Sequence, residues 1–298
     1  MFAIEVKQIL KAYGNRAAVN NVSFDVNQGE IFGLIGPNGA GKTTTIRMMM
    51  DIIKPDSGEI KVMGEKLNDG SKNKIGYLPE ERGLYKKMSV MDTIIYFASL
   101  KGVDKVTARK RGEEMLKRAD LLPHQNKRIE ELSRGMGQII QVIITTIHEP
   151  DLIILDEPFS GLDPVNTQLL KDMIRELKNR GKTIIMSTHL MNDIEELCDR
   201  LLMINKGRAV LYGSVAEVKS KYRNNAVLIE TKGDLTGIEG VTGITPHSGA
   251  LELKLDENTT PQMVLERLVK KGIVINRFEL SMPSLTEIFI KVVGDEHE

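Results

Sequence analysis

Residues 30–50, EIFGLIGPNGAGKTTTIRMMM, decide the fold of this chain. The nearly continuous apolar run at 30–35 is typical of a strand buried on both faces, and residues 43–50 favour a helix. The loop between them matches the pattern G-x4-G-K-T at 36–43, whose glycines let successive backbone N–H groups surround a phosphate at the helix N-terminus. A strand, this loop and a helix in that order predict a binding site for nucleotide phosphates.

The sequence around this unit predicts a parallel sheet covered by helices. Strand character returns at 152–155 and 183–187, and a helix is expected between them over 164–180. Strands that alternate with helices in this way form parallel sheets. Nearer the N-terminus, residues 4–9 and 18–26 alternate apolar and polar side chains, which indicates half-exposed antiparallel strands.

Two further regions depart from this α/β core. Residues 85–147 change to helical periodicity, with helices expected over 91–101 and 107–119, and predict a helical insertion. A domain boundary is expected near 212–225, so that residues 1–215 and 216–298 form separate domains. The tail mixes strands and helices, which predicts a small α+β domain; its expected strands are 226–230, 241–245, 250–255 and 273–280, and its expected helices are 260–271 and 285–293.

The composition limits the class of protein. Lys plus Arg equal Asp plus Glu at 41 each, and aromatic residues make up 4% with no Trp, so we expect no nucleic-acid partner. The longest apolar segments, near 139–147 and 152–155, are shorter than the roughly 18 residues of a spanning helix, and we identify no secretory signal. We therefore expect a soluble chain. Cys198 is expected to be a buried small residue on the helix after Leu190.

Residues at the ends of the buried strands complete the predicted phosphate site. Lys42 would bridge the β- and γ-phosphates, the Thr43 hydroxyl would bind Mg²⁺, and Thr44 would contact the α-phosphate. Asp156 would hold Mg²⁺ through water, while Glu157 would polarise the attacking water. The expected nucleotide-binding loop consists of Gly36, Pro37, Asn38, Gly39, Ala40, Gly41, Lys42 and Thr43.

Two other residues have both a functional and a structural interpretation. His189 follows the strand at 183–187, where a neutral imidazole would hydrogen-bond the γ-phosphate. A lone histidine is more often structural, but its place one strand after Asp156 and Glu157 favours the functional interpretation. Tyr13 would either stack on adenine or pack at the strand edge, and the sequence leaves both open.

A turn between the loop and the acids narrows the class. ELSRGMGQ at 131–138 lies between GPNGAGKT and the apolar run DLIILDEP. Ser133 is a suitable N-cap for the following helix, and Ser133 and the Gly135 amide can hydrogen-bond a phosphate oxygen. Together these motifs resemble those of the ATP-binding subunits of ATP-binding cassette (ABC) transporters. The later phrases GRAVLYGSVAEVKSKY and PSLTEIFIKVVG are similar to the bacterial ABC-2 export group, which includes ATPases of sodium-extrusion and drug-resistance exporters.

This resemblance implies roles for further residues. Residues 36–43 correspond to the Walker A loop, 152–157 to Walker B and 160–163 to the D-loop, which communicates between two ATP sites. Glu80, in GYLPEERGLY, takes the position usually filled by the glutamine of the Q-loop and is expected near Mg²⁺. Compared with the usual LSGGQ signature, Arg134 replaces the first glycine and Met136 the glutamine. Arg134 would either add charge toward the nucleotide or face solvent.

The resemblance also implies an assembly. Two copies, or this chain and a second ABC ATPase, would pack head to tail around two ATPs, each capped by Ser133 and Gly135 of the other subunit. ATP binding and hydrolysis would drive separate permease subunits of an exporter, which would hold the chain at the cytoplasmic face of the membrane. The alternatives are a soluble ABC ATPase without a transport role and a regulatory module with impaired hydrolysis. The single cassette disfavours the first, and the retained Lys42, Glu157 and His189 disfavour the second.

Overall fold

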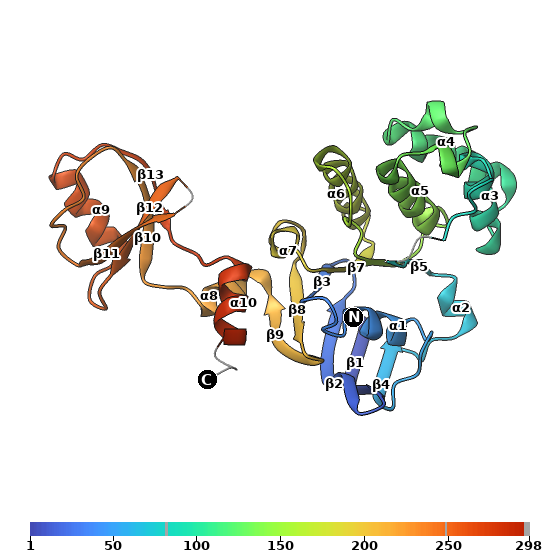
Figure 1. The fold of residues 1–298 in the computed structure, drawn as a ribbon, viewed down its shortest axis with the longest axis horizontal. Coiled ribbons are helices and arrows are strands. Elements are labelled where there is room, and N and C mark those ends of the chain that lie inside the picture. The colour runs from blue at the N-terminus through green and yellow to red at the C-terminus, as the bar shows by residue number, and fades with distance from the viewer. Residues whose placement is uncertain (81–82, 248, 295–298) are drawn as a thin grey trace. The chain divides into compact units, whose positions relative to one another are not determined.

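The computed structural model describes residues 1–80, 83–247 and 249–294, which form two compact units, Met1–Val215 and Ala216–Glu298. Figure 1 shows the helices and strands of both units. Glu81 and Arg82, which follow Glu80 in the sequence, lie outside the described residues.

A mostly parallel sheet forms the centre of the first unit. Its strand order is β5-β6-β7-β3-β8-β9, in which β9 runs antiparallel to β8. The strands are β3 (Ile31–Ile35), β5 (Ile75–Leu78), β6 (Leu152–Asp156), β7 (Thr183–Thr188), β8 (Arg200–Asn205) and β9 (Arg208–Ser214). Every residue of β3, β6 and β7 is buried, which explains their continuous apolar runs. The expected α/β core is confirmed.

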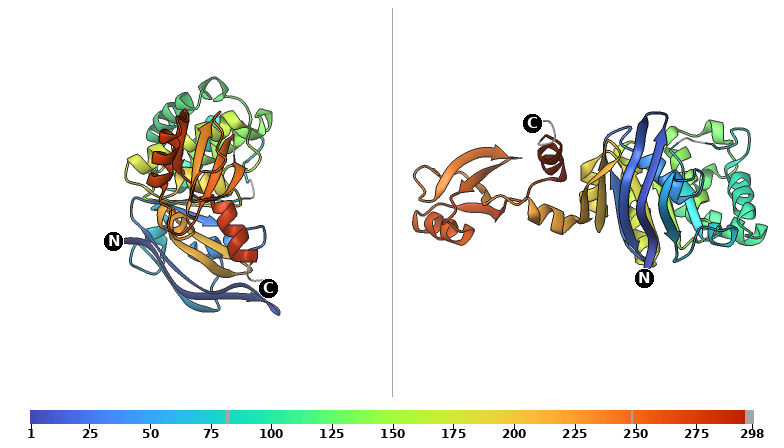
Figure 2. Two further views of the ribbon diagram at one scale, coloured as in Figure 1. Left: turned by 90° about the vertical axis from the view of Figure 1, so that its left-hand side faces the viewer. Right: turned by 90° about the horizontal axis from the view of Figure 1, so that it is seen from below.

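An antiparallel sheet lies against this core. Its order is β2-β1-β4, with β1 (Phe2–Tyr13), β2 (Arg16–Asn27) and β4 (Ser57–Val62). The right-hand view of Figure 2 shows β1 and β2 running side by side over their whole length. Both strands are longer than the sequence predicts, because irregularities in their pairing register interrupt the alternation of buried and exposed side chains toward the strand ends.

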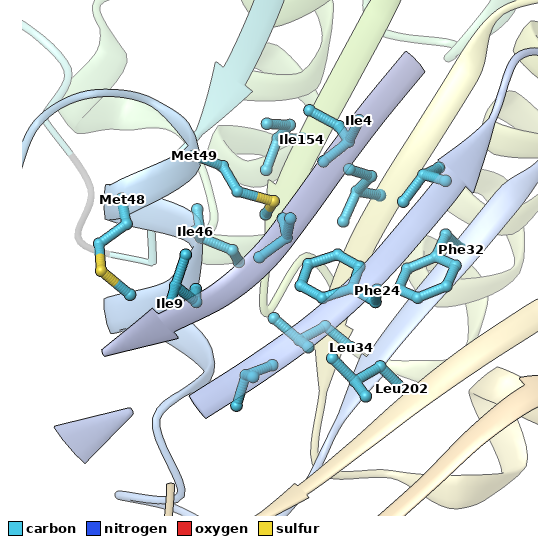
Figure 3. Close-up of a cluster of buried hydrophobic side chains, with 14 of the residues drawn as sticks. Ile4, Ile9, Phe24, Phe32, Leu34, Ile46, Met48, Met49, Ile154 and Leu202 are labelled. Carbon is cyan, nitrogen blue, oxygen red and sulfur yellow. The ribbon is translucent and has the colours of Figure 1, made fainter. Parts of the chain in front are cut away.

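One apolar core joins the two sheets to the helix that follows the glycine-rich loop, α1 (Lys42–Met49). Ile46 and Met49 of α1 belong to the same buried cluster as Ile9 of β1 and Leu34 of β3, which Figure 3 labels. Phe24 of β2 stacks on Phe32 of β3 with ring centroids 5.5 Å apart. Burial of these side chains holds α1 in place, and with it the loop at its N-terminus.

The expected helical insertion consists of α3 (Val90–Leu100), α4 (Lys105–Arg118) and α5 (Arg134–Thr146), which lie together in Figure 1. Each helix begins after a residue whose side chain accepts a hydrogen bond from the first turn, and these caps are Ser89, Asp104 and Ser133. The other helices of this unit are α2 (Asp69–Lys72), α6 (Pro164–Asn179) and α7 (Met191–Leu197), with 3₁₀ turns at Leu122–His124 and Ile129–Glu131.

The second unit is a small α+β domain. Its antiparallel sheet has the order β11-β12-β10-β13, with β10 (Ala226–Thr231), β11 (Val241–His247), β12 (Ala250–Leu255) and β13 (Ile275–Leu280). The helices are α8 (Val215–Lys221), α9 (Pro261–Lys270) and α10 (Leu285–Gly294). Val264 and Leu268 of α9 pack on Val227, Ile229 and Leu253 of the sheet. In the parts of the chain that the structure describes, no helix has the length and apolar character needed to cross a membrane.

Several expectations need correction. The sequence reading missed β4 and β5, because β4 is only partly buried and β5 has 4 residues. Strand β13 begins at Ile275 rather than at residue 273, since Gly272 turns the chain with φ +70° and the Ile273 amide still bonds to Leu268 of α9. Cys198 is buried as expected, but it follows the end of α7 in extended conformation instead of lying on the helix.

The close approach of β5 to α5 generates a testable prediction. A Cβ atom on Gly76 would lie 2.3 Å from the backbone oxygen of Thr145. We expect Gly76→Ala to lower the free energy of unfolding of the first unit by about 1–3 kcal/mol, because backbone has to shift. Gly137→Ala is the control, since its Cβ would meet nothing within 4 Å. Urea unfolding would measure both, and equal midpoints would contradict the prediction.

Candidate functional site

The glycine-rich loop is shaped by close contacts with its own unit. It leaves β3 at Gly36, where a Cβ atom would lie 2.1 Å from the Ile204 oxygen. At Gly41, φ is +113° and a Cβ would lie 2.4 Å from the Ala18 oxygen. No L-side chain fits at either point without moving backbone. The loop therefore requires these glycines to bring its backbone against β2 and β8.

Lys42, the first residue of α1, is buried and held by the loop. Its Nζ donates a hydrogen bond of 2.7 Å to the Gly36 oxygen and lies 3.4 Å from Glu157 Oε1. The helix itself begins without a side-chain cap and without an acidic residue in its first turn. The positive end of the helix dipole and the ammonium of Lys42 thus lie together, an arrangement that attracts anions.

Ser187 contacts both Asp156, the last residue of β6, and Glu157, which follows the strand. Its hydroxyl donates to Asp156 Oδ1 and accepts a 3.0 Å hydrogen bond from the Glu157 backbone N–H. Glu157 has φ +50°, a left-handed conformation that costs a residue with a Cβ about 1–3 kcal/mol. The bond from Ser187 stabilises this turn. Sequence analysis missed Ser187, although a polar residue at the end of an otherwise apolar strand was a usable signal.

The Glu157 carboxylate lies between a lysine and a histidine. Its Oε2 is 3.0 Å from His189 Nδ1, and its Oε1 faces Lys42. Glu157 is only 9% exposed, whereas the His189 side chain is 45% exposed. The structure thus brings together three of the residues that sequence analysis selected, from the ends of three different segments of the chain.

A cleft of about 640 Å³ opens in front of Lys42 and Glu157, and His189 contacts Glu157 without lining the cleft itself. Most residues of the expected loop line it, and so do Tyr13 and Glu80, which sequence analysis also selected. Tyr13 ends β1, is 55% exposed and has the Lys11 ammonium 5.9 Å from its ring centre. The cleft is lined by Tyr13, Arg16, Ala18, Asn38, Gly39, Ala40, Gly41, Lys42, Thr43, Thr44, Glu80 and Glu157. Arg16 and Ala18 were not expected from the sequence, because they carry no motif.

The turn ELSRGMGQ does not line this cleft and packs elsewhere in the same unit. Ser133 caps α5 by accepting a 3.2 Å hydrogen bond from the Met136 amide, and its side chain is exposed. The buried Gln138 side chain donates to the Pro158 oxygen at 3.0 Å. The exposed Arg134 reaches over Gly161, where an added Cβ would lie 2.4 Å from the guanidinium carbon. Ser133 and Gly135 are therefore separate from the cleft of their own chain.

Comparison with known proteins places these features in a family. The ABC transporter family matches residues 19–160, and the C-terminal domain of DrrA1-3-like ATP-binding proteins matches residues 213–293. The chain is 41% identical over 298 residues to the ABC transporter ATP-binding protein YhaQ of Bacillus subtilis, across 99% of this chain and 100% of the relative. It is 32% identical over 305 residues to the Nod factor export ATP-binding protein I of Rhizobium etli, across 100% and 95%.

Two further comparisons agree. The linearmycin resistance ATP-binding protein LnrL of Bacillus subtilis is 31% identical over 307 residues, across 98% of each chain. A solved structure described as the ATP-binding subunit of an ABC transporter aligns with a TM-score of 0.68 at 30% identity, covering 74% of this chain and 93% of that one. The fold and its phosphate loop thus define an ATPase of the P-loop class. The chain belongs to the ABC transporter ATP-binding family, and its C-terminal domain is of the DrrA-like type.

The hydroxyl of Ser187 provides a test of how the acids are held. We expect Ser187→Ala to lower the kcat of ATP hydrolysis roughly 10- to 100-fold, because Asp156 and the Glu157 turn lose their shared partner. The free energy of unfolding of Ser187→Ala should also fall by about 1–3 kcal/mol, because buried polar groups lose their hydrogen bonds. Thr146→Val is the control, since Thr146 is a buried hydroxyl that bonds only to the carbonyls of its own helix. Similar kcat values for the two variants would show that the Ser187 hydroxyl does not hold Asp156 and Glu157 in the position that hydrolysis needs.

Proposed function

We propose that the cleft binds the phosphates of ATP with Mg²⁺ and that Glu157 polarises the water that attacks the γ-phosphate. The observation that carries this proposal is the position of the buried Glu157 carboxylate between Lys42 and His189 at the wall of the cleft. A buried carboxylate with a histidine partner can orient a water and accept hydrogen bonds from it. Lys42 would exchange its bond with the Gly36 oxygen for the phosphates.

The oxygen atoms near the cleft suit a magnesium ion. Asp156 Oδ2 is buried and makes no hydrogen bond with the described residues. Thr43 and Glu80 line the cleft. Across residues 1–80, 83–247 and 249–294, no cluster of three or more His, Cys, Asp or Glu is arranged to hold a metal. Mg²⁺ keeps waters and takes phosphate oxygens as ligands, so Asp156, Thr43 and Glu80 would complete its shell only when ATP is bound.

A head-to-tail dimer would complete the site. Ser133 is exposed at the N-terminus of α5, where its hydroxyl and the helix dipole favour an anion. Because neither Ser133 nor Gly135 lines the cleft of its own chain, a phosphate that they cap would belong to a second subunit. We infer that two copies, or this chain and a second ABC ATPase, enclose two ATPs, and that hydrolysis lets the two subunits separate.

The similarity of this chain to subunits of named exporters supports a proposal about the direction of transport, namely export. The relatives from Rhizobium etli and Bacillus subtilis are named for Nod factor export and linearmycin resistance, and each aligns with at least 95% of its own length. We infer that this chain also powers an exporter of the ABC-2 type. Its permease would hold it at the cytoplasmic face of the membrane.

A groove beside the Glu80 loop suits the permease. Its volume is about 260 Å³, and its lining includes Leu84, Phe97, Leu100, Gln141 and His148. Leu100 is 61% exposed, and the buried Oε1 of Gln141 makes no hydrogen bond with the described residues. Burial lowers the pKa of His148 to about 4, so this histidine is neutral at pH 7. An apolar helix that brings a hydrogen-bond donor for Gln141 would fill the groove.

The role of Glu157 can be tested with its amide. We expect Glu157→Gln to lower steady-state ATP hydrolysis by at least about 100-fold and to retain ATP in a dimer, because the amide cannot polarise the water. Hydrolysis assays and size-exclusion chromatography with ATP would measure both effects. Glu149→Gln, on the surface beside Arg111, is the control. Normal hydrolysis together with no ATP-dependent dimer would refute the proposal.

The groove can be tested separately. We expect Leu100→Glu to reduce co-purification with the proposed permease subunit several-fold, because a charge would enter an apolar contact. The ATPase rate of the isolated chain should not change. Val106→Glu, on the 79% exposed surface of α4, is the matched control. Equal co-purification of the two variants would show that the permease binds elsewhere.

A further inference from the structure

The helix that follows His189 has little local support. Helix α7 has seven residues, no side-chain cap at its N-terminus, and begins after the exposed Leu190. A helix of this length is not stable alone and takes its position from tertiary contacts. The side chains of Ile194 and Leu197, on one face of α7, are buried. Apolar packing is not directional, so it leaves sliding and rotation of the helix weakly restrained.

A buried lysine on the neighbouring helix supplies directional contacts to two residues of α7, and the more exposed Arg175 of the same helix adds a second partner to one of them, Glu196. Lys171 of α6 is 8% exposed, and its Nζ lies 2.9 Å from Asp193 Oδ1 and 2.5 Å from Glu196 Oε2. Burial alone would lower the pKa of Lys171, but its hydrogen bonds to Glu196 and Asp193 outweigh burial and raise this pKa. The ammonium is therefore charged at neutral pH, and it joins one turn of α6 to two successive turns of α7.

The same ammonium also reaches the segment after Glu157. It lies 5.7 Å from the centre of the Phe159 ring, which is itself buried. A cation at this distance is attracted to the ring face. Phe159 follows Glu157 by two residues, and Asp193 follows His189 by four. The Glu157 and His189 side chains meet at 3.0 Å. Lys171 thus contacts the chain a few residues after each member of this pair.

We propose that Lys171 is a positioning residue that holds His189 against Glu157 by tying α7 to the segment carrying Phe159. This inference rests on the proposed roles of Glu157 and His189 in hydrolysis. It adds a cause for their geometry: His189 lies between the end of β7 at Thr188 and the start of α7 at Met191, so the place of its ring depends on the position of α7 as well as on that of the strand. Loss of the ammonium would let α7 shift and separate the pair.

Steady-state kinetics of the full chain would test this inference. We expect Lys171→Met to lower kcat for ATP hydrolysis roughly 10- to 100-fold and to leave KM for ATP within about twofold, since the phosphate loop is not touched. Lys171→Arg should restore kcat to within about threefold, because the guanidinium keeps the charge and the donors. Lys178→Met is the matched control, since Lys178 lies on the same helix and pairs with Asp199 beyond α7 at 2.6 Å.

A double variant separates this inference from the proposed function. If Lys171 acts through His189, Lys171→Met should cause no further loss of kcat in a His189→Ala background. Independent, multiplying losses would overturn the inference and leave the role of His189 intact. Unchanged hydrolysis in His189→Ala alone would instead contradict the proposed function. A normal kcat in Lys171→Met, or equal defects in Lys171→Met and Lys171→Arg, would also overturn the inference.

The position of the His189 ring can be observed without turnover. Its imidazole proton resonance, assigned by its absence in His189→Gln, should shift in Lys171→Met and stay unchanged in Lys178→Met. If Lys171→Met does not fold, Glu196→Gln replaces it, because the Glu196 side chain is 40% exposed and its loss removes one of the bonds to Lys171. Glu196→Gln also weakens the ion pair between Glu196 and Arg175, so Arg175→Met is the control for the loss of that pair. An unchanged His189 resonance in the folded variant would refute the inference.

Discussion

The register of the adjacent parallel strands β6, β7 and β3 is the constraint on which the site depends. Ile35, the last residue of β3, pairs with Thr188 of β7, and Asp156 of β6 pairs with Ser187. The carboxyl ends of these strands therefore lie in one row at one edge of the sheet. The phosphate loop, the acids and His189 each follow one of these ends. A shift of any strand by one residue would turn its side chains to the opposite face and separate the site.

Polar contacts at this edge oppose the cost of placing charged groups in a buried position. Glu157 takes a left-handed backbone conformation, and Ser187 stabilises it through the amide of Glu157 and the carboxylate of Asp156. Lys42 offsets the charge of Glu157 at 3.4 Å. Buried charges are tolerated only when they are paired in this way. The same pairing leaves groups that can exchange a protein partner for a phosphate or a metal.

Contacts within the first unit also connect the cleft to distant surfaces. Gln138 of α5 bonds to the Pro158 oxygen, directly after the acids, so α5 and the end of β6 are joined by a buried hydrogen bond. Glu80 lines the cleft, and the neighbouring segment at 83–84 lines the groove between β5 and α5. Movement of the helical insertion relative to the sheet would therefore shift the segment that carries Asp156 and Glu157. Rigid bodies joined by few directional contacts can transmit such movements.

By itself, the sequence determined the phosphate loop, the alternation of strands and helices and the family, because these depend on local spacing and on glycine, lysine and apolar patterns that act within a few residues. The helix boundaries were nearly predictable, since caps such as Ser133 and Asp163 are local signals. Only the tertiary structure decided that Ser187 joins the two acids and that Lys171 joins α7 to Phe159. Those contacts link residues remote in the chain, and their distances depend on strand register and helix packing, which no single segment encodes.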